Sequence, residues 1–165
     1  MDTEVKSSSS IIGWREWVSL PVLGLIAIKA KIDSGAKTSS LHAFDIFLEE
    51  EGGKTYVLFK IHPLQNNSSL VISCRAIMVD RRIVTDSGGH KEERYVIRTS
   101  LHIAGVKKKV ELTLTNRASM KYRMLIGRAA LKQFYVDPSQ SYLAGKTIKQ
   151  RRFLKELKLQ LEKDA

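Results

Sequence analysis

The chain has 165 residues, of which 43% are hydrophobic, which is enough for one well-buried core and too little for two domains of typical size. Lys and Arg total 28 against 17 Asp and Glu, so the formal net charge of +11 favours anionic partners. The single cysteine, Cys74, excludes an internal disulfide, and no apolar run reaches the roughly 18 residues of a membrane span. We therefore expect one cytoplasmic domain that has no membrane partner.

Short strand-like runs dominate the chain after a polar start. Residues 1–10 are rich in serine and lack the apolar core of a secretory signal, so we expect a disordered arm there. Residues 11–145 alternate between runs rich in Val, Ile, Thr and aromatics and turn residues, which predicts an antiparallel β barrel or sandwich. The predicted strands are 14–20, 22–32, 44–48, 56–61, 70–78, 82–85, 94–103 and 107–115.

A carboxylate stands where the predicted strand over residues 22–32 ends. Asp33 is followed by Ser34 and Gly35, which turn the backbone sharply. Aspartic peptidases hold an acid/base carboxylate at such a turn, where backbone N–H groups and a hydroxyl surround it. The same three residues also close ordinary turns, so the motif alone leaves both interpretations open.

The same tripeptide occurs again in a different setting. Asp86, Ser87, Gly88 and Gly89 lie between two runs that predict a polar hairpin. Glycine at a hairpin tip permits positive φ angles, so we interpret this copy as a flexible tip.

Two later segments complete the pattern. Residues 124–131 form a short apolar run with Gly127 and Arg128, followed by a predicted short helix. Residues 146–165 predict a basic amphipathic helix that packs on the barrel or on a partner subunit. Its apolar stripe comprises Phe153, Leu154, Leu157 and Leu161.

The order of these motifs resembles the retropepsins, whose one-domain chains carry D-[ST]-G-A early and a G-R segment late. More specifically, residues 12–142 resemble the bacterial and archaeal retropepsin-like family long labelled "ATP-dependent zinc protease". This resemblance is carried by residues 12–21, 31–43 and 112–128. It implies a closed, retropepsin-like β barrel with a C-terminal helix.

The old family label implies zinc and ATP, and the sequence favours neither. There is no H-E-x-x-H segment, Cys74 has no C-x-x-C partner, and no phosphate-binding G-x-x-x-x-G-K-[ST] loop is present. We expect no metal and no cofactor. The histidines, which are widely spaced in the sequence, are His42, His62, His90 and His102.

The resemblance also assigns roles to the motifs. It implies that Asp33 is catalytic, together with Ser34 and Gly35, and that two copies of the chain must meet because each carries one such aspartate. Residues 81–93 would be the flap that closes over substrate, with its tip at Asp86, Ser87, Gly88 and Gly89. The expected substrate-binding residues are Ala36, Lys37, Thr38 and Arg128.

The charge beside the catalytic turn points to acidic substrates. Viral retropepsins usually place an acidic residue where this chain has Lys37, so Lys37 and Arg128 would leave two cations near the cleft. Either substrate carboxylates neutralise them, or Asp45 or Glu16 does. The resemblance further implies glutamate trimming from the tail of a small-subunit ribosomal protein.

A non-catalytic function remains as the alternative. A basic β barrel can bind RNA or the ribosome, with aromatic side chains stacking bases on an exposed face. The aromatic residues here lie in apolar runs that suit a core, so nucleic acid is a less favoured partner. Those residues are Trp14, Trp17, Phe44, Phe59 and Tyr95.

Overall fold

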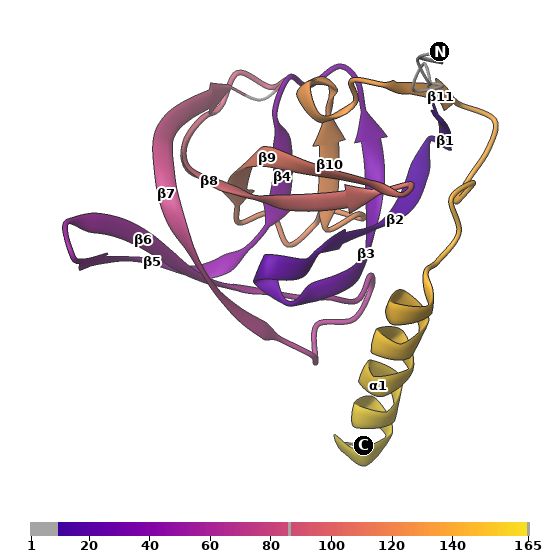
Figure 1. The fold of residues 1–165 in the computed structure, drawn as a ribbon. Coiled ribbons are helices and arrows are strands. Elements are labelled where there is room, and N and C mark those ends of the chain that lie inside the picture. Colours follow the sequence, from indigo (N-terminus) through magenta and orange to yellow (C-terminus); the bar gives the residue numbers. More distant parts are fainter. Residues whose placement is uncertain (1–9, 86, 165) are drawn as a thin grey trace, which may run out of the picture.

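The computed structural model describes residues 10–85 and 87–164, which form a curled β sheet followed by one helix (Figure 1). The strands are β1 (Ser10–Gly13), β2 (Arg15–Leu20), β3 (Leu25–Asp33), β4 (Ser39–His42), β5 (Phe44–Glu51), β6 (Lys54–Ile61), β7 (Ile72–Thr85), β8 (Lys91–Ile103), β9 (Val106–Thr115), β10 (Met124–Gly127) and β11 (Phe134–Asp137). Two 3-10 turns, η1 (Pro21–Leu23) and η2 (Arg128–Ala130), and the helix α1 (Ile148–Asp164) complete the chain.

Six strands form the barrel. Their order is β2-β3-β10-β4-β9-β8, and a single residue pair between β2 and β8, Ser19 with His102, closes it. Apolar side chains such as Ile28, Leu112 and Ile126 fill the inside and are buried. Their removal from water is the main source of stability. The predicted fold class, a mostly β barrel with a C-terminal helix, is confirmed.

The central strands place three chain segments side by side. β10 pairs parallel to β3 and antiparallel to β4, so the carboxyl ends of β3 and β10 reach the same edge (Figure 1). Gly127 is the register partner of Asp33. The turn after Asp33 therefore lies directly against the segment that follows β10.

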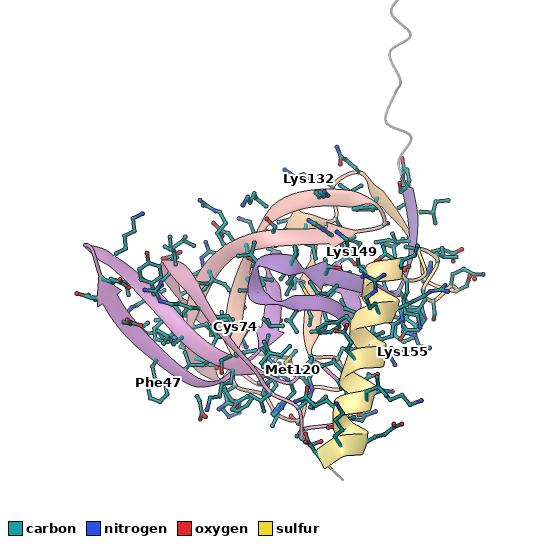
Figure 2. The ribbon with its side chains drawn as sticks, turned by 60° about the horizontal axis from the view of Figure 1, so that its bottom comes forward. Phe47, Cys74, Met120, Lys132, Lys149 and Lys155 are labelled. Carbon is teal, nitrogen blue, oxygen red and sulfur yellow. The ribbon has the colours of Figure 1, made fainter. Side chains whose placement is uncertain are left out.

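The remaining sheet extends beyond the barrel. β7, β6 and β5 continue it from β8, and the β5–β6 hairpin projects away from the body (Figure 1). Figure 2 shows Phe47 on this hairpin, and its side chain is largely exposed. The two predicted strands 70–78 and 82–85 form one continuous strand, β7. The pairing with β8 continues through the polar residues between them, with a register shift between Met78 and Asp80.

The helix α1 leaves the barrel and contacts it mainly through β3 (Figure 1). Thr147 and Gln150 begin it with a capping box: the Gln150 N–H donates to Thr147 Oγ1, and the Thr147 N–H donates to Gln150 Oε1. The predicted apolar stripe from Phe153 to Leu161 is half-buried, while Lys155 is exposed and faces outward (Figure 2). No helix in the described ranges is long and apolar enough to span a membrane.

Candidate active site

The turn that follows β3 presents Asp33. Pairing with β10 ends at this residue, and the backbone then reverses with a hydrogen bond from the Ala36 N–H to the Asp33 carbonyl, 3.2 Å long. Asp33 is half-buried, while Ser34 and Gly35 are exposed. The carboxylate therefore stands at the edge of the barrel, within reach of solvent and a ligand.

Backbone hydrogen bonds join this turn to the end of β10 and to the residues that follow it. The Arg128 N–H donates to the Ala36 carbonyl at 2.8 Å, and the Ala129 N–H donates to the Lys37 carbonyl at 3.0 Å. The Gly127 N–H donates to the buried Ser39 hydroxyl at 3.0 Å. These bonds hold the turn in one position relative to β10.

Only glycine fits at position 127. A Cβ there would lie 2.6 Å from the carbonyl carbon of Thr38 and 2.8 Å from the carbonyl oxygens of Lys37 and Thr38. Such distances are far inside van der Waals contact, so the backbone of the turn can approach β10 only because Gly127 has no side chain. This explains the glycine of the late G-R segment.

A cleft of about 690 Å³ opens between the Asp33 turn and the β7–β8 hairpin. Ser87 and Gly88, from the predicted flap tip, line it opposite the turn, and Gly89 has the positive φ of +82° expected at a hairpin tip. Asp86 lies outside the described residues. The cleft is lined by Asp33, Gly35, Ala36, Lys37, Thr38, Ser40, Arg82, Val84, Thr85, Ser87, Gly88, Arg94, Thr113, Arg117 and Leu125.

Apart from Asp33, the charged side chains that line this cleft in the described part of the chain are cations. Arg82 bonds Glu111 and Asp80, and Arg94 bonds Glu92. Lys37 and Arg117 form no ion pair with any described residue. They are the cations left to meet a negatively charged ligand.

Arg128 differs from the expectation that it joins Lys37 in one subsite. Its side chain is exposed and its Nη1 donates to the Gly35 carbonyl at 3.3 Å, outside the set of residues that line the cleft. The reason is local: η2 turns the chain away immediately after Gly127. Among the described residues, Arg128 acts on the turn, and Lys37 has Arg82, Arg94 and Arg117 as its cationic neighbours in the cleft.

The acidic partners considered for Lys37 and Arg128 have other roles. Asp45 pairs with Lys60 at 3.2 Å. Glu16 is fully buried, and its carboxylate accepts backbone N–H bonds from Gly13, Leu143 and Ala144 at 2.6, 3.0 and 3.0 Å. Glu16 thereby holds the segment before α1 against the barrel. The prediction that Asp45 or Glu16 neutralises Lys37 and Arg128 is therefore wrong.

Two histidines that are distant in the sequence meet in space. The rings of His42 and His62 stack 5.9 Å apart, with Phe44 against His62 at 4.4 Å. His42 Nδ1 accepts the Arg117 N–H at 3.1 Å, and burial, then Arg123, then His62 hold the pKa of His42 below its usual value. Within residues 10–85 and 87–164, no three His, Cys, Asp or Glu side chains gather as a metal site would require.

The lowered pKa of His42 predicts that acid destabilises the protein. Because the unfolded chain takes up the proton near the ordinary value of 6.5 and the folded chain does not, the contribution of neutral His42 is complete above pH 6.5 and is lost as the pH falls. The free energy of unfolding, measured by denaturant titration, should therefore drop between pH 7.5 and about pH 5. His42→Asn should flatten that drop, since an Asn oxygen can still accept the Arg117 N–H. Equal slopes for the wild type and His42→Asn would contradict the assignment.

The comparisons with known proteins agree with this geometry. The sequence model of the RimB-like family, described as "Retropepsin-like aspartic endopeptidase RimB", matches residues 11–147. Proteins named "Probable alpha-L-glutamate ligase" are 48% identical in Shewanella pealeana and 42% identical in Desulfotalea psychrophila, over 82% and 87% of this chain. The chain spans only 30% and 31% of those relatives.

A solved structure supports the same assignment. The crystal structure of Lpg0085, a protein of unknown function from Legionella pneumophila, matches with a TM-score of 0.67 and 27% identity, covering 83% of this chain and 99% of that chain. The family match covers the Asp33 turn, the β7–β8 hairpin and the Gly127–Arg128 segment alike. The chain belongs to the RimB-like family of retropepsin-like aspartic endopeptidases.

Proposed function

We propose that the protein is an aspartic peptidase that hydrolyses amide bonds in acidic, glutamate-rich peptides, with Asp33 as its acid/base residue. The observation that carries the proposal is the position of Asp33. It lies on a turn held by backbone hydrogen bonds, in a cleft whose other charged side chains among the described residues are cations and which a hairpin tip faces. A carboxylate in such a cleft can activate water, and the cations can hold an anionic substrate beside it.

Catalysis by this residue needs a second carboxylate. One must be ionised to take a proton from the attacking water, and the other must be protonated to polarise the carbonyl. Two carboxylates about 3 Å apart share a single proton and titrate as a pair. Because Asp33 is the only carboxylate among the described residues that line the cleft, a second copy of the chain supplies its partner in this mechanism.

The sheet of β1 and β11 supports assembly into a homodimer. It lies at the same edge of the molecule as the ends of β3 and β10 (Figure 1). In the described residues it consists of these two strands alone, which leaves open edges. It also exposes apolar side chains, with Ile11 60% and Tyr135 68% accessible. A second copy could bury both, next to the two Asp33 turns.

The charge of the cleft and the names of the relatives both support an acidic substrate. Lys37 and Arg117 are the cations without an ion-pair partner in the described cleft, and a carboxylate ligand would supply one. The relatives named as glutamate ligases contain a segment like this chain within a longer protein. A peptidase of matching specificity would remove what a glutamate ligase adds, so we propose peptides that end in several glutamates as substrates.

Peptides that end in glutamates should be cleaved faster than the same peptides ending in glutamines. Replacement of Lys37 by Met should reduce this preference in kcat/KM by roughly 10-fold, because a charge-assisted contact contributes about 1.5–3 kcal/mol and ~1.4 kcal/mol is a factor of ten. The rates are measured by mass spectrometry of the released residues. Lys155→Met on α1 makes the same change of charge away from the cleft and should keep the wild-type ratio. An unchanged ratio in Lys37→Met would rule out this lysine as the source of the selectivity.

A further inference from the structure

A second cavity, separate from the cleft, contains a buried arginine. It has a volume of about 400 Å³ and shares no lining residue with the Asp33 cleft. It is lined by residues from strands β2 and β3, from the loop over residues 63–67 and by the residue before β10. Its lining residues are Trp17, Ile28, Lys29, Pro63, Leu64, Gln65, Asn66, Asn67 and Arg123.

Arg123 is the unusual member of this set. Its side chain lies in the cavity wall, the residue is only 7% exposed, and its Nε has no hydrogen-bond partner. No described carboxylate forms an ion pair with it, whereas Arg94, whose side chain is 11% exposed, is paired with Glu92 at 2.9 Å. A buried guanidinium without a counter-charge is costly, so this site favours an anion from outside the chain.

A second cation, Lys29, lines the same cavity, and Lys146 lies near its Trp17 wall. Lys29 Nζ donates to Gln65 Oε1 at 3.3 Å and lies 5.4 Å from the centre of the Trp17 ring. Lys146 Nζ lies 5.2 Å from the centre of the same ring. No Asp or Glu lines the cavity among the described residues. A negative charge there would meet Arg123 and Lys29 without repulsion from a neighbouring carboxylate.

We propose that this cavity binds an aliphatic carboxylate, either free glutamate or a glutamate side chain of a peptide. The Arg123 fork and Lys29 would hold the carboxylate oxygens, and the apolar wall of Trp17, Ile28 and Leu64 would cover the methylene groups. A bare inorganic phosphate fits less well, because it would leave the apolar wall and most of the volume uncovered. Only the choice of glutamate among carboxylates depends on the proposed function.

An anion held here would connect the two strands that carry the Asp33 turn. Lys29 lies on β3 four residues before Asp33, which at roughly 3.3 Å per residue is about 13 Å along the strand. Arg123 directly precedes β10, which pairs with β3 up to the Gly127–Asp33 pair. The site is therefore distinct from the cleft and is joined to it by two rigid strands.

Isothermal titration of the Asp33→Asn protein tests the proposal without any hydrolysis. L-Glutamate, a triglutamate peptide and inorganic phosphate are the three probes. We expect one or both glutamate probes to bind more tightly than phosphate, and Arg123→Met or Lys29→Met to weaken that binding roughly 10- to 100-fold. Lys29 is half-buried, whereas Arg123 is buried, so the Lys29 variant gives an answer even where Arg123→Met fails to fold. The indole N–H resonance of Trp17 should shift on titration while that of Trp14 stays in place.

Two controls separate this site from the cleft. Lys37→Met changes the cleft and Lys54→Met changes a distant surface, so binding at the cavity should be retained in both. Tighter binding of triglutamate identifies a peptide tail as the ligand, and tighter binding of L-glutamate identifies the free amino acid. Loss of binding in Lys37→Met with retention in Lys29→Met would place the ligand in the cleft and overturn the proposal. Binding of phosphate alone, or of none of the three probes, would overturn it as well.

Discussion

Replacement of Asp33 by Asn should reduce peptide hydrolysis by roughly 10³-fold or more while leaving the fold and the subunit assembly intact. The amide has nearly the shape of the carboxylate, but it can neither take a proton from water nor share one with a second Asp33. General acid–base catalysis alone contributes about 10² to 10⁴, and here both functions of the pair are lost together. The measurements are kcat/KM on a glutamate-tailed peptide, the thermal midpoint and the mass by sedimentation.

Two further aspartates make the comparison specific. Asp45→Asn removes a carboxylate that pairs with Lys60, and Asn tolerates the left-handed φ of +49° found there, so its activity should match the wild type. Asp86→Asn changes the second copy of the tripeptide, at the predicted flap tip, and should alter the rate only modestly. Equal losses in Asp33→Asn and Asp86→Asn would instead support two catalytic aspartates in one chain. A fully active monomer at the lowest concentrations would contradict the dimer.

Local patterns were sufficient to predict most of the barrel. Alternation in residues 107–115 and the turn residues around them correctly predicted the strand β9. The expectation that its second face is solvated was wrong for the last residues, because Thr113 and Thr115 are buried there as well. The end of β3 at Asp33 could also be predicted, since Ser34 and Gly35 favour a turn. The strands missed from the predicted list, β1, β4, β10 and β11, are four residues long, which is too short for a period to emerge.

The contents of the cleft could not be predicted in the same way. Arg82, Arg94 and Arg117 reach it because β7, β8 and the end of β9 fold over the Asp33 turn, and no local pattern marks them. The stacking of His42 on His62 likewise depends on which strand ends meet. Arg128 was expected in the cleft because the resemblance brings its segment against the turn, but its guanidinium bonds the Gly35 carbonyl and does not line the cleft. The position of each of these side chains depends on how the strands pair, which residue composition does not reveal.

Gly127→Ala should damage both stability and activity, because the added methyl group would collide with the backbone of the Asp33 turn. Its Cβ would meet the Thr38 carbonyl carbon at 2.6 Å and two carbonyl oxygens at 2.8 Å, and all three are backbone atoms that cannot rotate away. Overpacking of this kind costs about 1–3 kcal/mol of stability, and the strain is relieved only by displacing the Asp33 turn. A displacement of ~1 Å at a reacting group costs roughly 10²-fold in rate. We therefore expect both the free energy of unfolding and kcat to fall.

Gly52→Ala separates these two effects. Gly52 lies in the β5–β6 hairpin with a φ of +59° and no atom within 4 Å of an added Cβ, so alanine there is strained without colliding with anything. That strain costs about 1–2 kcal/mol, a loss of stability similar to the one expected for Gly127→Ala. Its kcat should nevertheless stay at the wild-type value, because the hairpin projects away from the barrel (Figure 1) and Gly52 does not line the cleft. If Gly127→Ala loses as much stability as Gly52→Ala but keeps the wild-type kcat, the prediction is contradicted. The close packing of the turn against β10 would then have no part in positioning the Asp33 carboxylate.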